Sequence, residues 1–139
     1  MRIITAGLFA GLIPVIILVA VVTIHEYITT PGLDKNAYVS YAEKAGHYIG
    51  PVAGTLATLG MGFWAARKPR QKRILHGLLT GVFVILLDLA IFATPKTDFE
   101  LEDLLVLTAK LVAGLLGGYL AWLRYRRQPP ETRKSHRLI

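Results

Sequence analysis

The sequence predicts an all-α protein, a membrane-spanning four-helix bundle. Of its 139 residues, 53% are hydrophobic; they gather in four blocks, and nearly all charged residues lie between the blocks. Each block holds about the 20 apolar residues that a helix needs to cross a hydrocarbon core of ~30 Å. A helix of a soluble core would show a polar face at every turn or so, and these blocks do not.

The first predicted span covers residues 3–24 and contains no charged residue. Arg2 before an apolar stretch is also typical of a signal peptide, but the stretch is long for one and lacks a small-residue cleavage site. Because three more spans follow, we expect this first helix to be retained. Pro14 lies inside it and should bend it, which a bundle of helices tolerates.

A polar segment, residues 25–46, separates the first span from the second, which covers about residues 48–66. Within the segment, Pro31 and Gly32 predict a turn. Asp34 is expected to cap a short helix that ends before the second span begins.

The third and fourth predicted spans each contain one charged residue. The third covers about residues 74–94 and includes Asp88, and the fourth covers about residues 104–123 and includes Lys110. A charge inside the membrane costs on the order of 3 kcal/mol, so both side chains should face protein or water.

The distribution of Lys and Arg predicts the orientation. Arg2, the loop at 67–73 and the C-terminal tail carry 12 of the 16 basic residues, the two connections on the other side carry 3, and Lys110 lies within a span. Short cytoplasmic loops are enriched in basic residues, so we expect both termini inside, in a bacterial inner membrane. Residues 1–125 should form a single transmembrane domain, followed by a flexible basic cytoplasmic tail at 126–139.

Asp88 and Lys110 are predicted to form an intramembrane ion pair. Their spans are consecutive and antiparallel, and at ~1.5 Å per residue both lie about 5 Å from the midpoint of their span, on the same side. One interpretation is a static pair that fixes which helices pack together. The other is a proton or substrate site, at which a ligand competes with Lys110 for Asp88.

Small residues recur four positions apart in every span. Such residues lie on one helix face and let two backbones approach closely. The faces either pack the bundle internally or form an oligomer interface, for which the second span is the best candidate. The glycines are Gly7, Gly11, Gly46, Gly50, Gly54, Gly62, Gly77, Gly81, Gly114 and Gly118. The similar spacing in the first and third spans also suggests two parallel helical hairpin repeats.

Acidic residues and two histidines gather at the predicted outer mouth. They form either an acidic vestibule that concentrates cations or an ordinary solvated face. The histidines lack further ligands at metal-binding spacing, so we expect no metal and no cofactor. The candidate vestibule residues are His25, Glu26, Glu43, His47, Glu102 and Asp103.

The sequence contains no hydrolase, phosphate-loop or metalloprotease motif, so we expect no enzyme activity. The net charge of +7 follows from membrane topology, so we expect anionic lipid headgroups at the cytoplasmic face as partners and no nucleic acid.

The favoured function is a scaffold or accessory subunit, in a homo-oligomer or a larger membrane complex. The alternative is a small oligomeric transporter or channel for protons or cations that uses Asp88. Complete burial of the ion pair would favour the first, and a cavity that reaches Asp88 from the acidic side would favour the second.

Overall fold

The structure, a computed structural model, confirms the predicted fold class. It describes residues 1–28, 32, 34–68, 72–92 and 101–126, and within these ranges it contains helices and turns but no strand. The helices are α1 (Arg2–Ile28), α2 (Lys35–Ala66), α3 (Arg73–Phe92) and α4 (Leu101–Tyr125). All four are long and apolar enough to cross a membrane, so the chain is a multi-pass membrane protein by length and composition.

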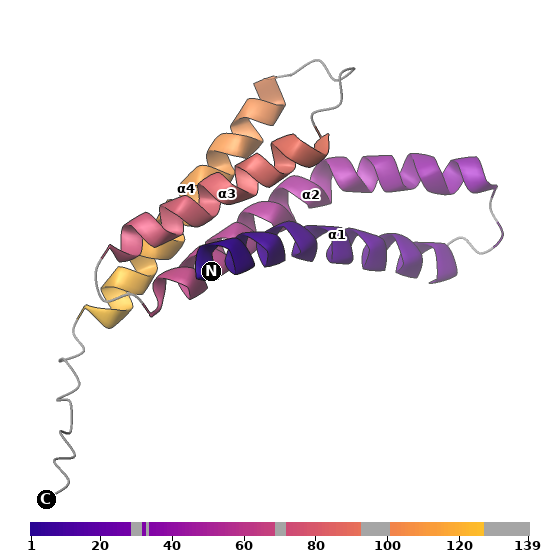
Figure 1. Cartoon of the computed structure of the whole chain (residues 1–139). Helices are drawn as coiled ribbons and strands as arrows, with labels where there is room; N and C mark the ends of the chain where they lie inside the picture. The colour runs from indigo at the N-terminus through magenta and orange to yellow at the C-terminus, as the bar shows by residue number, and fades with distance from the viewer. Residues whose placement is uncertain (29–31, 33, 69–71, 93–100, 127–139) are drawn as a thin grey trace, which may run out of the picture.

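The helices form two hairpins that diverge from a common end (Figure 1). In the described part of the chain, α2 and α3 contact each other and both outer helices, whereas α1 and α4 do not contact one another. At one end the α1–α2 hairpin and the α3–α4 hairpin lie close together, and toward the other end they separate.

The second helix differs from the sequence prediction. We expected a short helix after Asp34 and a separate span at 48–66, but α2 is one continuous helix of 32 residues. Packing against α1 explains the continuity: Leu18 lies against Gly46, and the ring of His25 stacks on Tyr41 at 3.7 Å between centroids. These contacts fix helical geometry across glycines that would weaken an isolated helix.

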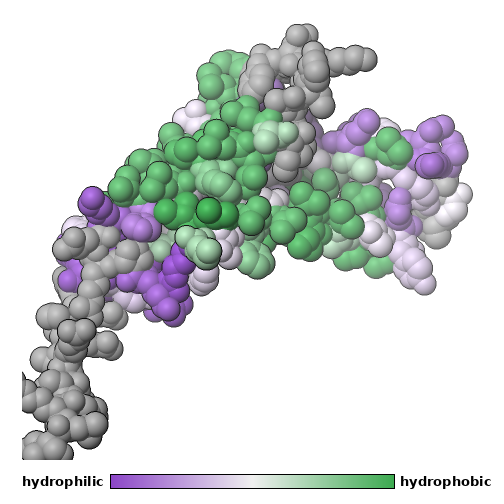
Figure 2. Space-filling model, viewed as in Figure 1, coloured by the Kyte–Doolittle hydropathy of each residue, from purple (hydrophilic) through white to green (hydrophobic). Residues whose placement is uncertain are grey.

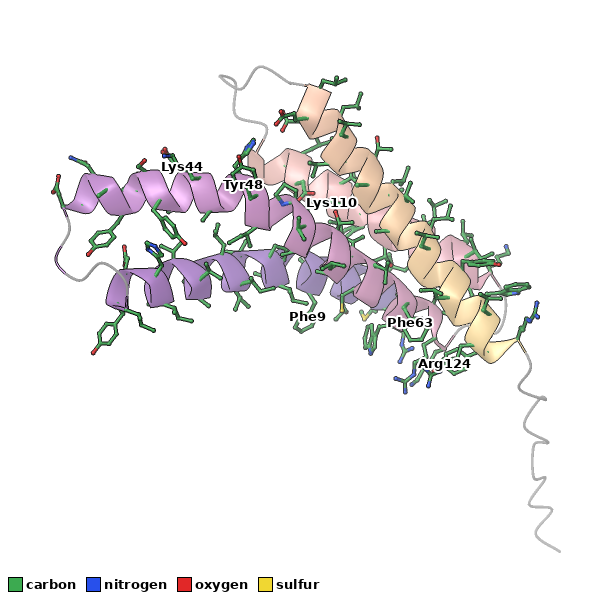
Figure 3. All side chains as sticks on the ribbon, turned by 180° about the vertical axis from the view of Figure 1, so that it is seen from behind. Phe9, Lys44, Tyr48, Phe63, Lys110 and Arg124 are labelled. Carbon is green, nitrogen blue, oxygen red and sulfur yellow. The ribbon has the colours of Figure 1, made fainter. Side chains whose placement is uncertain are left out.

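The length of α2 makes the α1–α2 hairpin extend beyond α3 and α4 (Figure 1). At 1.5 Å per residue its 32 residues span about 48 Å, more than a hydrocarbon core of ~30 Å. The helix bends near Tyr48 (Figure 3). Pro51 follows Tyr48 within the helix and removes one main-chain hydrogen bond, which is a usual cause of a bend.

The two ends of the bundle differ in charge. We call the end that carries Arg2, Arg67, Lys68, Lys72, Arg73 and Arg124 the basic end, and the opposite one the acidic end. Figure 2 shows the apolar surface between hydrophilic ends. At the basic end, three arginines lie over aromatic rings at 5.1–5.4 Å from the ring centroids: Arg2 over Trp64, Arg73 over Tyr125 and Arg126 over Trp122. Such Trp, Tyr and Arg groups are typical of the headgroup level of a membrane. The predicted tail from 127 onward and the loop at 93–100 lie outside the described residues.

Candidate functional site

The predicted glycine faces meet mainly inside the chain, in the half of the bundle toward the basic end. A Cβ atom added to Gly114 would lie 2.8–2.9 Å from backbone atoms of Gly77 and Gly81. A Cβ at Gly62 would lie 3.0 Å from the carbonyl oxygen of Gly114, and one at Gly118 would lie 2.9 Å from that of Arg73. The glycines therefore let the backbones of α2, α3 and α4 approach closely.

Other glycines accept side chains from a neighbouring helix. Phe83 of α3 packs on Gly7, and Leu87 of α3 reaches Gly11. Gly50 and Gly60, in contrast, have no atom within 4 Å of an added Cβ. The second span was the best candidate for an oligomer interface, but Gly54, Thr58 and Gly62, which lie four residues apart along it, are buried within the chain. The faces that these residues form serve packing inside the bundle.

The structure brings together the two charged residues of the third and fourth spans. Lys110 Nζ donates to Asp88 Oδ2 at 2.5 Å, and their side chains are 11% and 17% exposed, respectively. The stem of Lys110 lies along α2, because a Cβ at Gly54 would be 3.0 Å from Lys110 Cε. The absence of a side chain at Gly54 therefore makes room for the lysine that reaches Asp88.

A pocket of about 380 Å³ lies beside this ion pair. All four helices line it, and Lys110 marks its position where the two hairpins diverge (Figure 3). Along α2 the lining runs from Gly46 to Gly54, which at 1.5 Å per residue is about 12 Å of depth. The volume falls within the ~300–1,000 Å³ typical of small-molecule sites.

The lining of the pocket is mostly apolar and includes three charged residues. Pro14, Leu18, Pro51, Val106 and Leu107 supply apolar surface, whereas Asp88, Lys110 and Asp103 are the charged lining residues. Asp103 lies seven positions before Lys110, two turns nearer the acidic end of α4 and on the same helix face. Of these three charged residues, Asp88 and Lys110 pair with each other.

The candidate vestibule residues do not form one cluster. His47 Nε2 lies 3.5 Å from Glu102 Oε2 in an exposed pair between α2 and α4, whereas His25 stacks on Tyr41. Glu26 is half-buried and Glu43 is exposed. Among the residues that the structure describes, no three His, Asp or Glu side chains are grouped to hold a metal ion. Of the six candidates, only Asp103 lines the pocket.

Sequence reasoning did not identify the apolar walls of the pocket. Pro14 and Pro51 belong to consecutive antiparallel spans, and both line the pocket. A proline in the middle of each of two adjacent spans was a signal available in the sequence, since proline bends transmembrane helices where they border a cavity.

Comparisons with known proteins assign the chain to no family: no family model, curated protein or solved structure matches it. An inference about function therefore rests on the geometry of the pocket and of the ion pair.

Proposed function

We propose that this membrane protein binds a small solute with a positively charged group in the pocket between its hairpins, as part of a transporter or channel. Asp88 exchanges between Lys110 and the charged group of the solute. The acidic end faces outward and the basic end faces the cytoplasm of a bacterial cell. Solute enters from the acidic side.

The observation that carries this proposal is that the pocket reaches Asp88. A purely structural ion pair is best sealed from solvent, because low dielectric strengthens the pair and water would compete for it. Asp88 and Lys110 instead form part of a pocket wall, with residual exposure on both side chains. From the sequence alone a scaffold is the favoured function, whereas the pocket at Asp88 supports a transporter or channel.

The apolar lining and the carboxylate of Asp88 favour an organic cation with a compact apolar body. The walls from α1, α2 and α4 offer hydrocarbon surface, and Asp88 and Lys110 lie together at one level of the pocket. When a ligand ammonium replaces Lys110, Asp88 keeps a positive group beside its carboxylate and does not become a desolvated, unpaired charge. Lys110 then extends toward water.

Gly50 and Gly60 provide a matched pair of variants for the test. Both belong to α2 and have open space where a side chain would begin, but only Gly50 lines the pocket. Gly50→Leu should fill the pocket without forcing helices apart, whereas Gly60→Leu adds the same side chain elsewhere. Asp88→Asn removes the charge that binds the cation.

The experiment measures binding of benzyltrimethylammonium to the purified protein and its uptake into proteoliposomes, with proton and potassium flux recorded alongside. Benzenesulfonate, of similar size and opposite charge, is the control solute. We expect cation binding in wild type and Gly60→Leu, and a loss of about tenfold to a hundredfold in Asp88→Asn, since the quaternary ammonium loses its counter-charge at a part-buried site. Gly50→Leu should abolish binding. Equal binding by Gly50→Leu and Gly60→Leu would overturn the proposal.

A scaffold or accessory subunit is the second candidate. It is favoured by the glycine contacts and the ion pair, which together fix the packing of α2, α3 and α4. If wild type binds and moves no cation, while Asp88→Asn disrupts a native oligomer, the ion pair is an assembly device and this candidate replaces the first.

A further inference from the structure

We propose a second binding site, for a phosphate group, in a pocket at the basic end of the bundle. This pocket of about 460 Å³ is lined by Met1, Arg2, Ile3, Ala65, Lys68 and His76. The lining comes from the start of α1, the end of α2 with the residue beyond its cap, and the first turn of α3. None of these residues lines the pocket beside Asp88.

The described residues that line this pocket carry charge of one sign. Their polar members are Arg2, Lys68 and His76, and none of the described lining residues is acidic. Arg67, Lys72 and Arg73 are neighbours in the sequence, and no Asp or Glu occurs in residues 1–25, 44–87 or 104–126. Among the described residues that line the pocket, an anion would meet basic groups from α1, from α3 and from the segment after α2, with no opposing carboxylate. A solvated cluster of mixed charges would not offer this.

The arrangement of the individual side chains suits a phosphate. Arg2 lies over the ring of Trp64, with its guanidinium carbon 5.4 Å from the ring centroid, so the planar group is held in place while its donor edge stays available. Lys68 is exposed and adds a mobile ammonium.

His76 Nδ1 lies 3.0 Å from the carbonyl oxygen of Lys72, which assigns the Nδ1 proton to that hydrogen bond. Its other ring nitrogen, Nε2, then accepts from a protonated phosphate oxygen.

The pocket also borders apolar surface. Met1 and Ile3 form part of its lining, and beyond them α1 exposes Ile4 and Leu8 to the surroundings of the bundle. A phosphate with an acyl chain attached would therefore have basic groups for its head and hydrocarbon for its chain. Free inorganic phosphate would use the basic groups alone.

The experiment uses Trp64 as a reporter, since it touches Arg2 and the sequence contains only one other tryptophan, Trp122. The full chain with Trp122→Phe is reconstituted in phosphatidylcholine bilayers that contain a minority of brominated lipid. The brominated lipid is either phosphatidic acid or phosphatidylcholine with the same chains. Selective quenching by the acidic lipid reports its enrichment at the pocket.

Two variants that each lose two positive charges separate a local site from general attraction. The pocket variant carries Arg2→Gln and Lys68→Gln together with the neutral change His76→Gln, and the control carries Arg67→Gln and Lys72→Gln. We expect selective quenching to persist in the control and to disappear in the pocket variant. Each Lys or Arg neutralised at the pocket should lower the enrichment of the acidic lipid by up to about fivefold.

Inorganic phosphate, compared with chloride at equal ionic strength, distinguishes the two sources of the group. Loss of selective quenching in phosphate alone would support the site and show that it also takes the free ion. Persistence would support it as a lipid site. Equal loss in the pocket variant and the control, or no selectivity in the parent protein, would overturn the proposal, because either result reduces the effect to the general charge of the basic end.

Discussion

Replacing Gly114 with alanine should separate α3 from α4 and destabilise the bundle. The added Cβ would lie 2.8 Å from the carbonyl oxygen of Gly77 and 2.9 Å from the nitrogen and Cα of Gly81. All three are backbone atoms and cannot rotate away as a side chain would. The two helices must therefore move apart along their whole contact.

The magnitude follows from comparing two substitutions of the same kind. Overpacking of a close contact costs about 1–3 kcal/mol, while Gly→Ala in a helix gains up to about 1 kcal/mol of intrinsic helix preference. Gly60 has open space around an added Cβ, so Gly60→Ala carries the gain without the clash. Subtracting the change in unfolding free energy for Gly60→Ala from that for Gly114→Ala cancels the helix preference. The remainder, about 1–3 kcal/mol, is the cost of overpacking the contact between α3 and α4.

The assay is reversible unfolding in mixed detergent micelles, followed by far-ultraviolet circular dichroism for wild type, Gly114→Ala and Gly60→Ala. We expect Gly60→Ala to unfold at or above the wild-type midpoint and Gly114→Ala well below it. If Gly114→Ala is as stable as Gly60→Ala, then α3 and α4 do not approach one another at this glycine, and the packing described for the basic half of the bundle is wrong.

Three further outcomes are expected in the same unfolding assay. Asp88→Asn should destabilise the protein by about 3 kcal/mol because Lys110 loses its counter-charge, and adding Lys110→Met should recover most of that loss; additive losses in the double variant would argue against direct pairing. Gly54→Ala should lower stability less than Gly114→Ala, because the atom it meets is the flexible end of Lys110 rather than backbone; an equal loss would mean that the lysine has no other position. His47→Gln should change stability by at most about 1 kcal/mol, since its contact with Glu102 is exposed, and a larger loss would reveal a role beyond that surface pair.

The features that follow from spacing along one helix were predictable from the sequence. The four apolar blocks predicted four spans, and the equal depth of Asp88 and Lys110 in antiparallel neighbours predicted a pair that the structure places in contact. The glycine spacing predicted narrow helix faces, although it did not say which helices would meet there. Each of these inferences depends only on helical periodicity and on the thickness of a membrane.

The features that depend on contacts between distant segments were not predictable in the same way. Leu18 against Gly46, and His25 on Tyr41, make α2 continuous through a segment whose glycines and polar residues suggested a break. The basic-end pocket joins Arg2 to His76 through the packing of α1 on α3, which no local pattern encodes. Such contacts are set by how whole helices cross, and sequence spacing gives only the face that each helix offers.

The glycine contacts toward the basic end of the bundle also affect the half that holds the pocket beside Asp88. Close backbone contact at Gly62, Gly77 and Gly114 brings α2, α3 and α4 together toward the basic end. Pro14 and Pro51 line the pocket beside Asp88. The two hairpins diverge away from their common end (Figure 1). Helices that touch closely at one end and cross at an angle must separate at the other, so tight glycine packing determines where the pocket beside Asp88 opens. A substitution that loosens the glycine contacts should therefore change the pocket as well as the stability, although Gly114 itself does not line that pocket.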